Sequence, residues 1–171
     1  MDTTLKTNQT VVENQKEYEI IHLEKTKKVC VLCEKYSSSK AVKKDLIAVI
    51  SCEGACLRGE VSRRIANKIC FEELPKNTSR VCLGGAFTKD TGQRNMVRSA
   101  KRVISFEGCF IECASRMIKG VIPDLNPEVI IVDKYYTFDR NLFGINDVSE
   151  EELIKYTDEA ISNFRELLHA D

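Results

Sequence analysis

The stretch Leu-Ile-Ala-Val-Ile-Ser-Cys-Glu-Gly-Ala-Cys, residues 46–56, decides the fold class of this chain. Its first five residues form a continuous apolar run, the pattern of a strand that is buried on both faces in a parallel sheet. The run ends in a turn that contains Gly54. Apolar residues at helical spacing follow from about 59 to 70. The stretch therefore predicts a strand, a turn and a helix in succession.

The same alternation continues toward the C-terminus. Further strands are predicted at 79–83, 103–106 and 129–132. Helices are predicted at 90–101 and from just after Cys109 to a C-terminal cap at Gly120, with Cys113 on the second of them. A capping box at 149–152 opens a long final helix. This order predicts an α/β fold with a mostly parallel, Rossmann-like sheet and helices on both faces. We expect a flexible N-terminal segment at 1–28 and a single domain at 29–171.

Composition restricts the classes of function. The chain has 171 residues, of which 43% are hydrophobic and 30% are charged, as in soluble globular proteins. Its net charge of zero argues against general nucleic-acid binding. No apolar run is long enough to span a membrane, and the polar N-terminus does not resemble a secretory signal, so we expect a cytoplasmic protein. The charge is uneven, because residues 49–120 carry a net +6 and residues 121–171 a net −8. Either the two regions face each other, or the charge is simply distributed unevenly over the surface.

Eight cysteines are the most informative feature of the composition: Cys30, Cys33, Cys52, Cys56, Cys70, Cys82, Cys109 and Cys113. In a reducing compartment such a set indicates metal binding or redox chemistry rather than structural disulfides. Four of them fall where the predicted sheet would form a site. Cys52, Cys82 and Cys109 lie at or just after the ends of three predicted strands. Cys113 follows Cys109 by four residues, which would place both on one helix face.

The carboxyl ends of parallel strands meet at one edge of a sheet, and sites form in the crevice there. We therefore predict a four-sulfur site of Cys52, Cys82, Cys109 and Cys113. Four thiolates suit a tetrahedral zinc and equally suit an iron–sulfur cluster. Neighbouring helix N-termini would stabilise the thiolates, and the surplus negative charge would be compensated by Arg58, Arg63, Arg64 and Arg116.

The remaining cysteines leave alternatives open. Cys30, Cys33 and Cys56 would complete a second site, form a redox pair, or supply a fourth ligand in place of Cys82. The residues after Cys33 show no clear helix start, so a thioredoxin-type motif has little support there. Cys70 lies on the apolar face of a predicted helix and is interpreted as a core residue.

Three short motifs, at 52–55, 82–85 and 107–114, resemble the DGC domain family, prokaryotic proteins named for an Asp-Gly-Cys signature and proposed to bind zinc. The resemblance covers roughly residues 45–165. The signature Asp is Glu107 in this chain, and Phe110 stands where the family usually has proline. The resemblance implies metal binding and no established reaction. Cys56 and the Cys30/Cys33 pair lie outside the family pattern.

We therefore expect a zinc-binding protein. The alternatives are a thiol redox or sulfur-carrier enzyme, with Cys109 as nucleophile and Cys113 as resolving thiol, and an iron–sulfur electron-transfer or sensor protein. Whether the protein is an enzyme stays open, and no catalytic residue is assigned. The expected partner is another protein or a small thiol or metal donor, with neither nucleic acid nor membrane involved. The sequence does not predict an oligomeric state.

Overall fold

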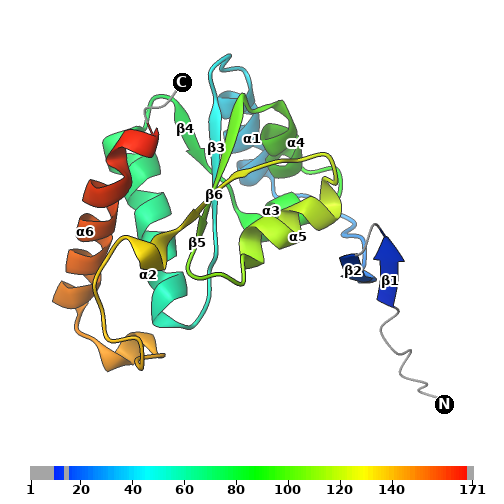
Figure 1. The fold of residues 1–171 in the computed structure, drawn as a ribbon. Helices are drawn as coiled ribbons and strands as arrows, with labels where there is room; N and C mark the ends of the chain where they lie inside the picture. Colours follow the sequence, from blue (N-terminus) through cyan, green and yellow to red (C-terminus); the bar gives the residue numbers. More distant parts are fainter. Residues whose placement is uncertain (1–9, 14–15, 169–171) are drawn as a thin grey trace.

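The computed structural model describes residues 10–13 and 16–168 of the chain, and Figure 1 shows its arrangement. Its centre is a parallel sheet in the order β4-β3-β5-β6. The strands are β3 (Ile47–Ser51), β4 (Thr78–Arg80), β5 (Arg102–Glu107) and β6 (Glu128–Ile131). The register pairs Ile47 with Thr78 on one side and with Arg102 on the other. The predicted α/β class with a parallel sheet is confirmed.

Helices cover both faces of this sheet. One face carries α2 (Leu57–Lys68), extended by the π-helical turn Ile69–Glu73, and α6 (Glu150–Leu168). The other face carries α1 (Val31–Ala41), α3 (Leu83–Phe87), α4 (Gly92–Ser99) and α5 (Cys113–Val121). Two 3-10 turns, Val132–Lys134 and Ile145–Asp147, lie in the connection from β6 to α6.

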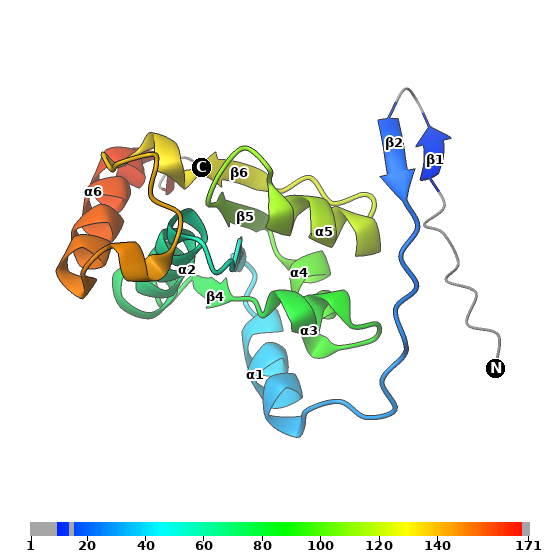
Figure 2. The ribbon, with the colours of Figure 1, turned by 90° about the horizontal axis from the view of Figure 1, so that it is seen from below.

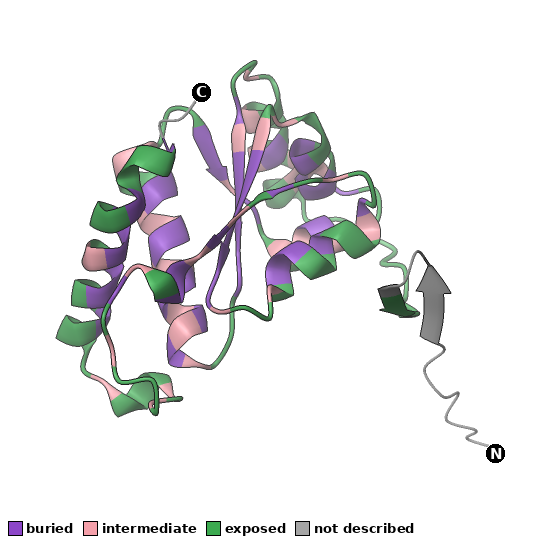
Figure 3. Ribbon diagram, in the orientation of Figure 1, coloured by how far each residue is buried: buried purple, intermediate pink, exposed green. Residues whose placement is uncertain are grey.

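Each face of the sheet has its own apolar core, and Figure 3 shows the buried positions concentrated on the strands and on the inner sides of the helices. The core under α2 and α6 includes Val49, Phe106 and Phe164, with the two phenyl rings 5.4 Å apart. The core on the opposite face includes Ile50 and Ile118. Successive residues of β3 thus enter different cores, which explains why this strand is apolar throughout.

The predicted elements are mostly correct, and the departures cluster around cysteines. The strand predicted at 79–83 ends at Arg80, because Cys82 already caps the short helix α3, which sequence analysis did not predict. Gly120 does not cap α5, since the helix continues through Val121. The capping box of α6 is confirmed by reciprocal bonds between Ser149 and Glu152, at 3.0 and 3.2 Å.

The N-terminal part holds a hairpin of β1 (Thr10–Glu13) and β2 (Lys16–Glu19), followed by an extended stretch. Residues 1–9, 14 and 15 of the segment expected to be flexible lie outside the described residues, and its flexibility stays a prediction. The hairpin lies to one side of the layered domain (Figure 2). The prediction that no helix starts after Cys33 is wrong, because α1 begins at Val31 and runs through that region.

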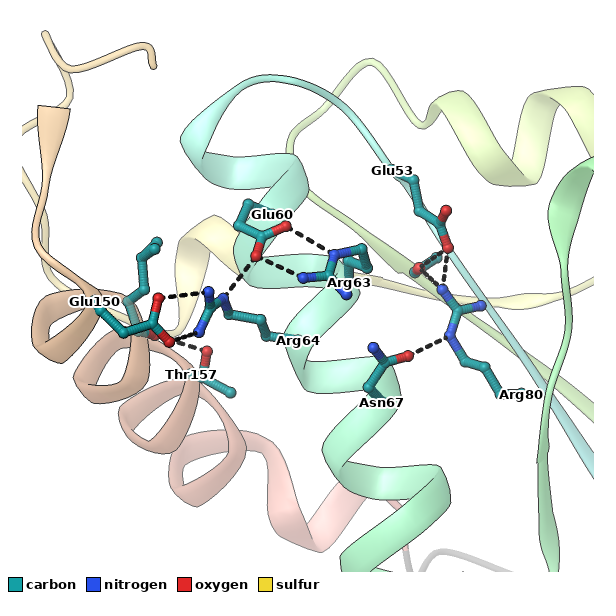
Figure 4. Close-up of polar contacts among 10 residues, drawn as sticks. Glu53, Glu60, Arg63, Arg64, Asn67, Arg80, Glu150 and Thr157 are labelled. Carbon is teal, nitrogen blue, oxygen red and sulfur yellow. Dashed lines mark hydrogen bonds and ion pairs between the residues drawn. The ribbon is translucent and has the colours of Figure 1, made fainter. Parts of the chain in front are cut away.

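Ion pairs between α2 and α6 join the basic middle of the chain to its acidic C-terminal third. Arg64 on α2 pairs with Glu150 at 2.5 Å (Figure 4), and Lys68 pairs with Asp158 at 2.6 Å. The basic middle and the acidic C-terminal third therefore do face each other, as one of the two interpretations held. Among residues 10–13 and 16–168, no helix combines the length and the apolar character needed to cross a membrane.

Candidate functional site

The candidate site lies where the strand order reverses. From β3 the chain crosses to β4 on one side, and β5 then pairs on the other side of β3. Loops that leave such neighbouring strands diverge and open a crevice at their carboxyl ends. The loops after β3 and β5 both emerge at the lower end of the sheet in Figure 1. Cys52 follows β3 directly and Cys109 follows β5, so these two cysteines flank the reversal point.

Sulfur atoms occupy helix N-caps at this edge, a position usually held by oxygen side chains. Cys56 caps α2, and its Sγ accepts a bond of 3.4 Å from the Gly59 amide. Cys82 caps α3 in the same way and accepts from the Gly85 amide at 3.4 Å. The motif glycines at 84 and 85 lie within α3.

Glu107, the residue at the signature position, is completely buried at the end of β5. One carboxylate oxygen accepts bonds from the Ser105 hydroxyl at 2.7 Å and the Ser115 amide at 2.6 Å. The other accepts from the Ala114 amide at 3.2 Å. Both amides belong to the first turn of α5, where backbone donors lack partners within the helix. Glu107 thus fixes the start of α5, and with it Cys113, relative to β5.

The spacing argument that placed Cys109 and Cys113 on one helix face is wrong. Cys109 lies in a bend after β5, and the residue before α5, Glu112, has a left-handed backbone with φ of 54°. Cys113 is the first residue of α5 and is exposed. The helix begins later than predicted because the Glu107 carboxylate satisfies the amides of Ala114 and Ser115.

Close backbone packing holds the loops after β3 and β5 against each other. A Cβ atom on Gly59 would lie 2.7 Å from the Gly54 nitrogen. A Cβ on Gly108 would lie 2.8 Å from the backbone carbon of Arg58. Only glycine permits these approaches, because the obstructing atoms belong to the backbone and cannot turn aside. Gly59 and Gly108 thus allow both loops to pack closely against the N-terminus of α2.

Arg80 ties the end of β4 to the loop that carries Cys52. Its guanidinium donates to the Ser51 hydroxyl at 2.6 Å and to the Asn67 side chain at 3.1 Å, and it pairs with Glu53 (Figure 4). The Arg80 side chain is only 10% exposed. Sequence analysis missed this residue, because nothing in the spacing of Arg80 distinguishes it from surface arginines.

Burial governs the chemistry of Cys52. It raises the pKa of this thiol to about 12, while the Gly108 amide acts in the opposite direction. Negative charge on Cys113, Glu107 and Cys56 raises the pKa further, which places these groups in the neighbourhood of Cys52. Cys82 instead contributes to the raised pKa of Cys33, although hydrogen bonding to Cys30 is the largest cause there. Cys56 and Cys113 are thus grouped with Cys52, whereas Cys82 is grouped with Cys33.

The predicted ligands are not assembled as they stand. Within the described part of the chain, no three Cys, His, Asp or Glu side chains form a group ready to hold a metal ion. Three of the four arginines expected to compensate charge have other partners. Arg58 pairs with Asp133 at 3.4 Å, and Arg63 and Arg64 both bind Glu60 at 2.7 Å.

Two further features lie away from this site. Cys70 is buried in the core beneath α2, as interpreted from the sequence. A pocket of about 840 Å³ lies at the opposite edge of the sheet, where Ile47, Asn77 and Arg102 mark the amino ends of their strands. No cysteine lines it. The thiols, not this pocket, therefore define the candidate site.

An open parallel sheet with thiols on the loops of its reversal point defines a cysteine-rich α/β domain. The chain belongs to the DGC domain family, whose model matches residues 48–159. The match begins in β3 and ends within α6, so it confirms the resemblance and leaves the hairpin and α1 outside. Comparison with curated proteins and with solved structures gave no match.

Proposed function

We propose that this protein binds zinc through Cys52, Cys82, Cys109 and Cys113. The observation that carries the proposal is that the segments after β3, β4 and β5 each bear a thiol at the same edge of the sheet. Four thiolates are the donor set of closed, tetrahedral zinc sites. If only three bind, an open position would let the metal activate a water or hold a transferred ligand.

The donor chemistry fits zinc, whereas the geometry requires a change on binding. Because the described thiols form no ready group, metal would have to draw the segments that carry them together. Cys52 is buried and protonated without metal, so binding would release its proton.

Cys56 is the alternative fourth ligand, because it lies in the neighbourhood of Cys52 whereas Cys82 lies near Cys33. Single Cys82→Ser and Cys56→Ser variants distinguish the two sets. Loss of metal in the first variant only supports the proposed ligands. Loss of metal in the Cys56→Ser variant alone would mean that Cys56, not Cys82, is the fourth ligand.

The test is metal analysis and visible absorption on protein purified without oxygen. We expect about one zinc per chain and no colour. Brown protein that contains iron and acid-labile sulfide would indicate an iron–sulfur cluster in place of the proposed zinc. Metal-free protein that takes up no added zinc would overturn the proposal and favour the thiol redox or sulfur-carrier alternative. Cys70→Ala is the matched control, because that thiol is buried in the core and should not affect metal content.

We also propose a cytoplasmic location, since a reducing compartment keeps such thiols available for metal. The proposed partner is a protein or a small thiol that delivers or receives the metal. Labile zinc bound by cysteines is exchanged through such thiol ligands.

A further inference from the structure

The helix α1 lies outside the family match but is fixed firmly to the domain. Its Glu34 carboxylate accepts the Gly92 amide at the start of α4 through both oxygens, at 2.9 and 2.8 Å. Its Tyr36 hydroxyl bonds to the Ser79 hydroxyl on β4 at 2.8 Å. Ser37 is buried at the same contact. The N-terminus of α1, which carries Cys30 and Cys33, is therefore held on a rigid support.

The two cysteines form a pair at the first turn of this helix. Cys30 is the N-cap of α1, with extended backbone at φ −75° and ψ 115°, and Cys33 lies in the first helical turn. The Cys30 side chain makes no capping hydrogen bond, in contrast to those of Cys56 and Cys82. The Cys33 thiol, one turn away, lies within hydrogen-bonding reach of the Cys30 sulfur. This is the arrangement in which two thiols can close a disulfide within one helical turn.

The pKa values of the two thiols are shifted in opposite directions. The Cys33 amide, then the Cys33 thiol and the Leu32 amide, lower the pKa of Cys30. The hydrogen bond to Cys30 raises the pKa of Cys33, and negative charge on Cys30 adds to the effect. Cys30 is thus the thiol that ionises first, while Cys33 keeps its proton.

Access to the pair is open. Both thiols are exposed, in contrast to the buried Cys52 and Cys70. The two residues between them, Val31 and Leu32, are 77% and 76% exposed and give the pair an apolar surrounding. An incoming disulfide can therefore reach Cys30, and an apolar segment around that disulfide can contact the flanking side chains.

We propose that Cys30 and Cys33 form a redox dithiol that reduces disulfides, with Cys30 as nucleophile and Cys33 as resolving thiol. The Cys30 thiolate attacks one sulfur of the disulfide, whose S–S bond breaks, and the released thiolate takes the proton that Cys30 gave up. Cys33 then loses its proton and attacks the Cys30 sulfur. The mixed disulfide breaks, and the second thiolate leaves and is protonated. The disulfide gains two electrons and two protons, and Cys30 and Cys33 become a disulfide.

The test uses the full chain, first reduced and then exposed to glutathione disulfide or to a peptide disulfide with apolar flanks. Cleavage after Lys28 and Lys35 yields one peptide, residues 29–35, that contains both cysteines. We expect this peptide to become lighter by the mass of two hydrogen atoms as oxidant is added. Faster oxidation by the apolar peptide would assign a protein disulfide as substrate. Equal rates would assign a low-molecular-weight disulfide.

Two matched variants test the roles. Cys33→Ser should trap a mixed disulfide on Cys30. Cys30→Ser should form its adduct on Cys33 at a rate lower by about tenfold or more. Equal trapping in both variants would overturn the assignment of roles. A 29–35 peptide that stays reduced in excess glutathione disulfide would overturn the proposal. A cross-link from that peptide to Cys82 as the main product would overturn it too. Metal content is not part of the readout, so the result is independent of the zinc proposal.

Discussion

Replacing Glu107 by glutamine tests the idea that this carboxylate holds the start of α5 in place. In Glu107→Gln the amide keeps one acceptor oxygen and turns an NH₂ group toward a backbone donor. With the oxygen facing Ser105 and Ser115, the NH₂ group would face the Ala114 amide at 3.2 Å. The opposite orientation leaves two donors without an acceptor. The first is therefore the better orientation.

The magnitude follows from the three bonds. One buried donor loses its acceptor, at a cost of about 1–3 kcal/mol. Two bonds to a charged acceptor become neutral, which costs about 1 kcal/mol each. The variant no longer has to bury a charge, which offsets part of this loss. We expect the free energy of unfolding to fall by about 2–4 kcal/mol, a large share of the roughly 5–15 kcal/mol of a typical domain.

Urea denaturation measures this change as a lower midpoint with an unchanged slope. Glu112→Gln is the matched control, because this residue precedes the same helix and makes no capping bond with its side chain. It should change the free energy by less than about 0.5 kcal/mol. A Glu107→Gln variant as stable as the control would refute the role of Glu107. Faster hydrogen exchange at Ala114 and Ser115 in Glu107→Gln would locate the loss at α5.

Four further predictions concern stability. Gly59→Ala should lower the free energy of unfolding by at least about 1–3 kcal/mol, because the new Cβ meets backbone at 2.7 Å. Gly120→Ala, which has open space in α5, should raise the same quantity by about 0.5–1 kcal/mol in the same urea titration. Arg80→Met should lower it by about 2–3 kcal/mol through the lost bonds to Ser51 and Asn67, and an unchanged midpoint would contradict this. Burial raises the pKa of Cys70 from 9.0 to about 11, so its contribution is complete below pH 9 and about 2–3 kcal/mol is lost as pH rises to 11. Thermal melts from pH 8 to 11 should show a shallower decline for Cys70→Ala, and parallel curves would contradict the shift.

The strands and long helices of this fold could be predicted because their signals are local. The apolar run that becomes β3 and the Ser149 capping box each need only neighbouring residues to be recognised. Helix α1 was missed because its stability comes from docking. Its sequence has almost no apolar face, and Glu34 and Tyr36 bind residues far along the chain. Tertiary contacts of this kind are not visible in local periodicity.

For the candidate site, sequence order located the cysteines at one edge but did not give their arrangement. The start of α5 depends on the Glu107 carboxylate, and the start of α3 depends on a sulfur cap at Cys82. Neither pattern is among the usual signals of a helix start, which are oxygen side chains next to the first turn. The grouping of Cys33 with Cys82 depends on the docking of α1, so it could not be predicted without that helix.

The sulfur caps at Cys56 and Cys82 decide how mutagenesis of this edge can be interpreted. Alanine at either position removes a helix cap, which by itself costs about 0.5–2 kcal/mol, and a cysteine-to-alanine scan would count that loss as lost metal binding. Serine keeps an acceptor at the cap while it removes the thiolate. The difference between the serine and alanine variants at one position therefore separates what the sulfur does as a ligand from what it does for the helix.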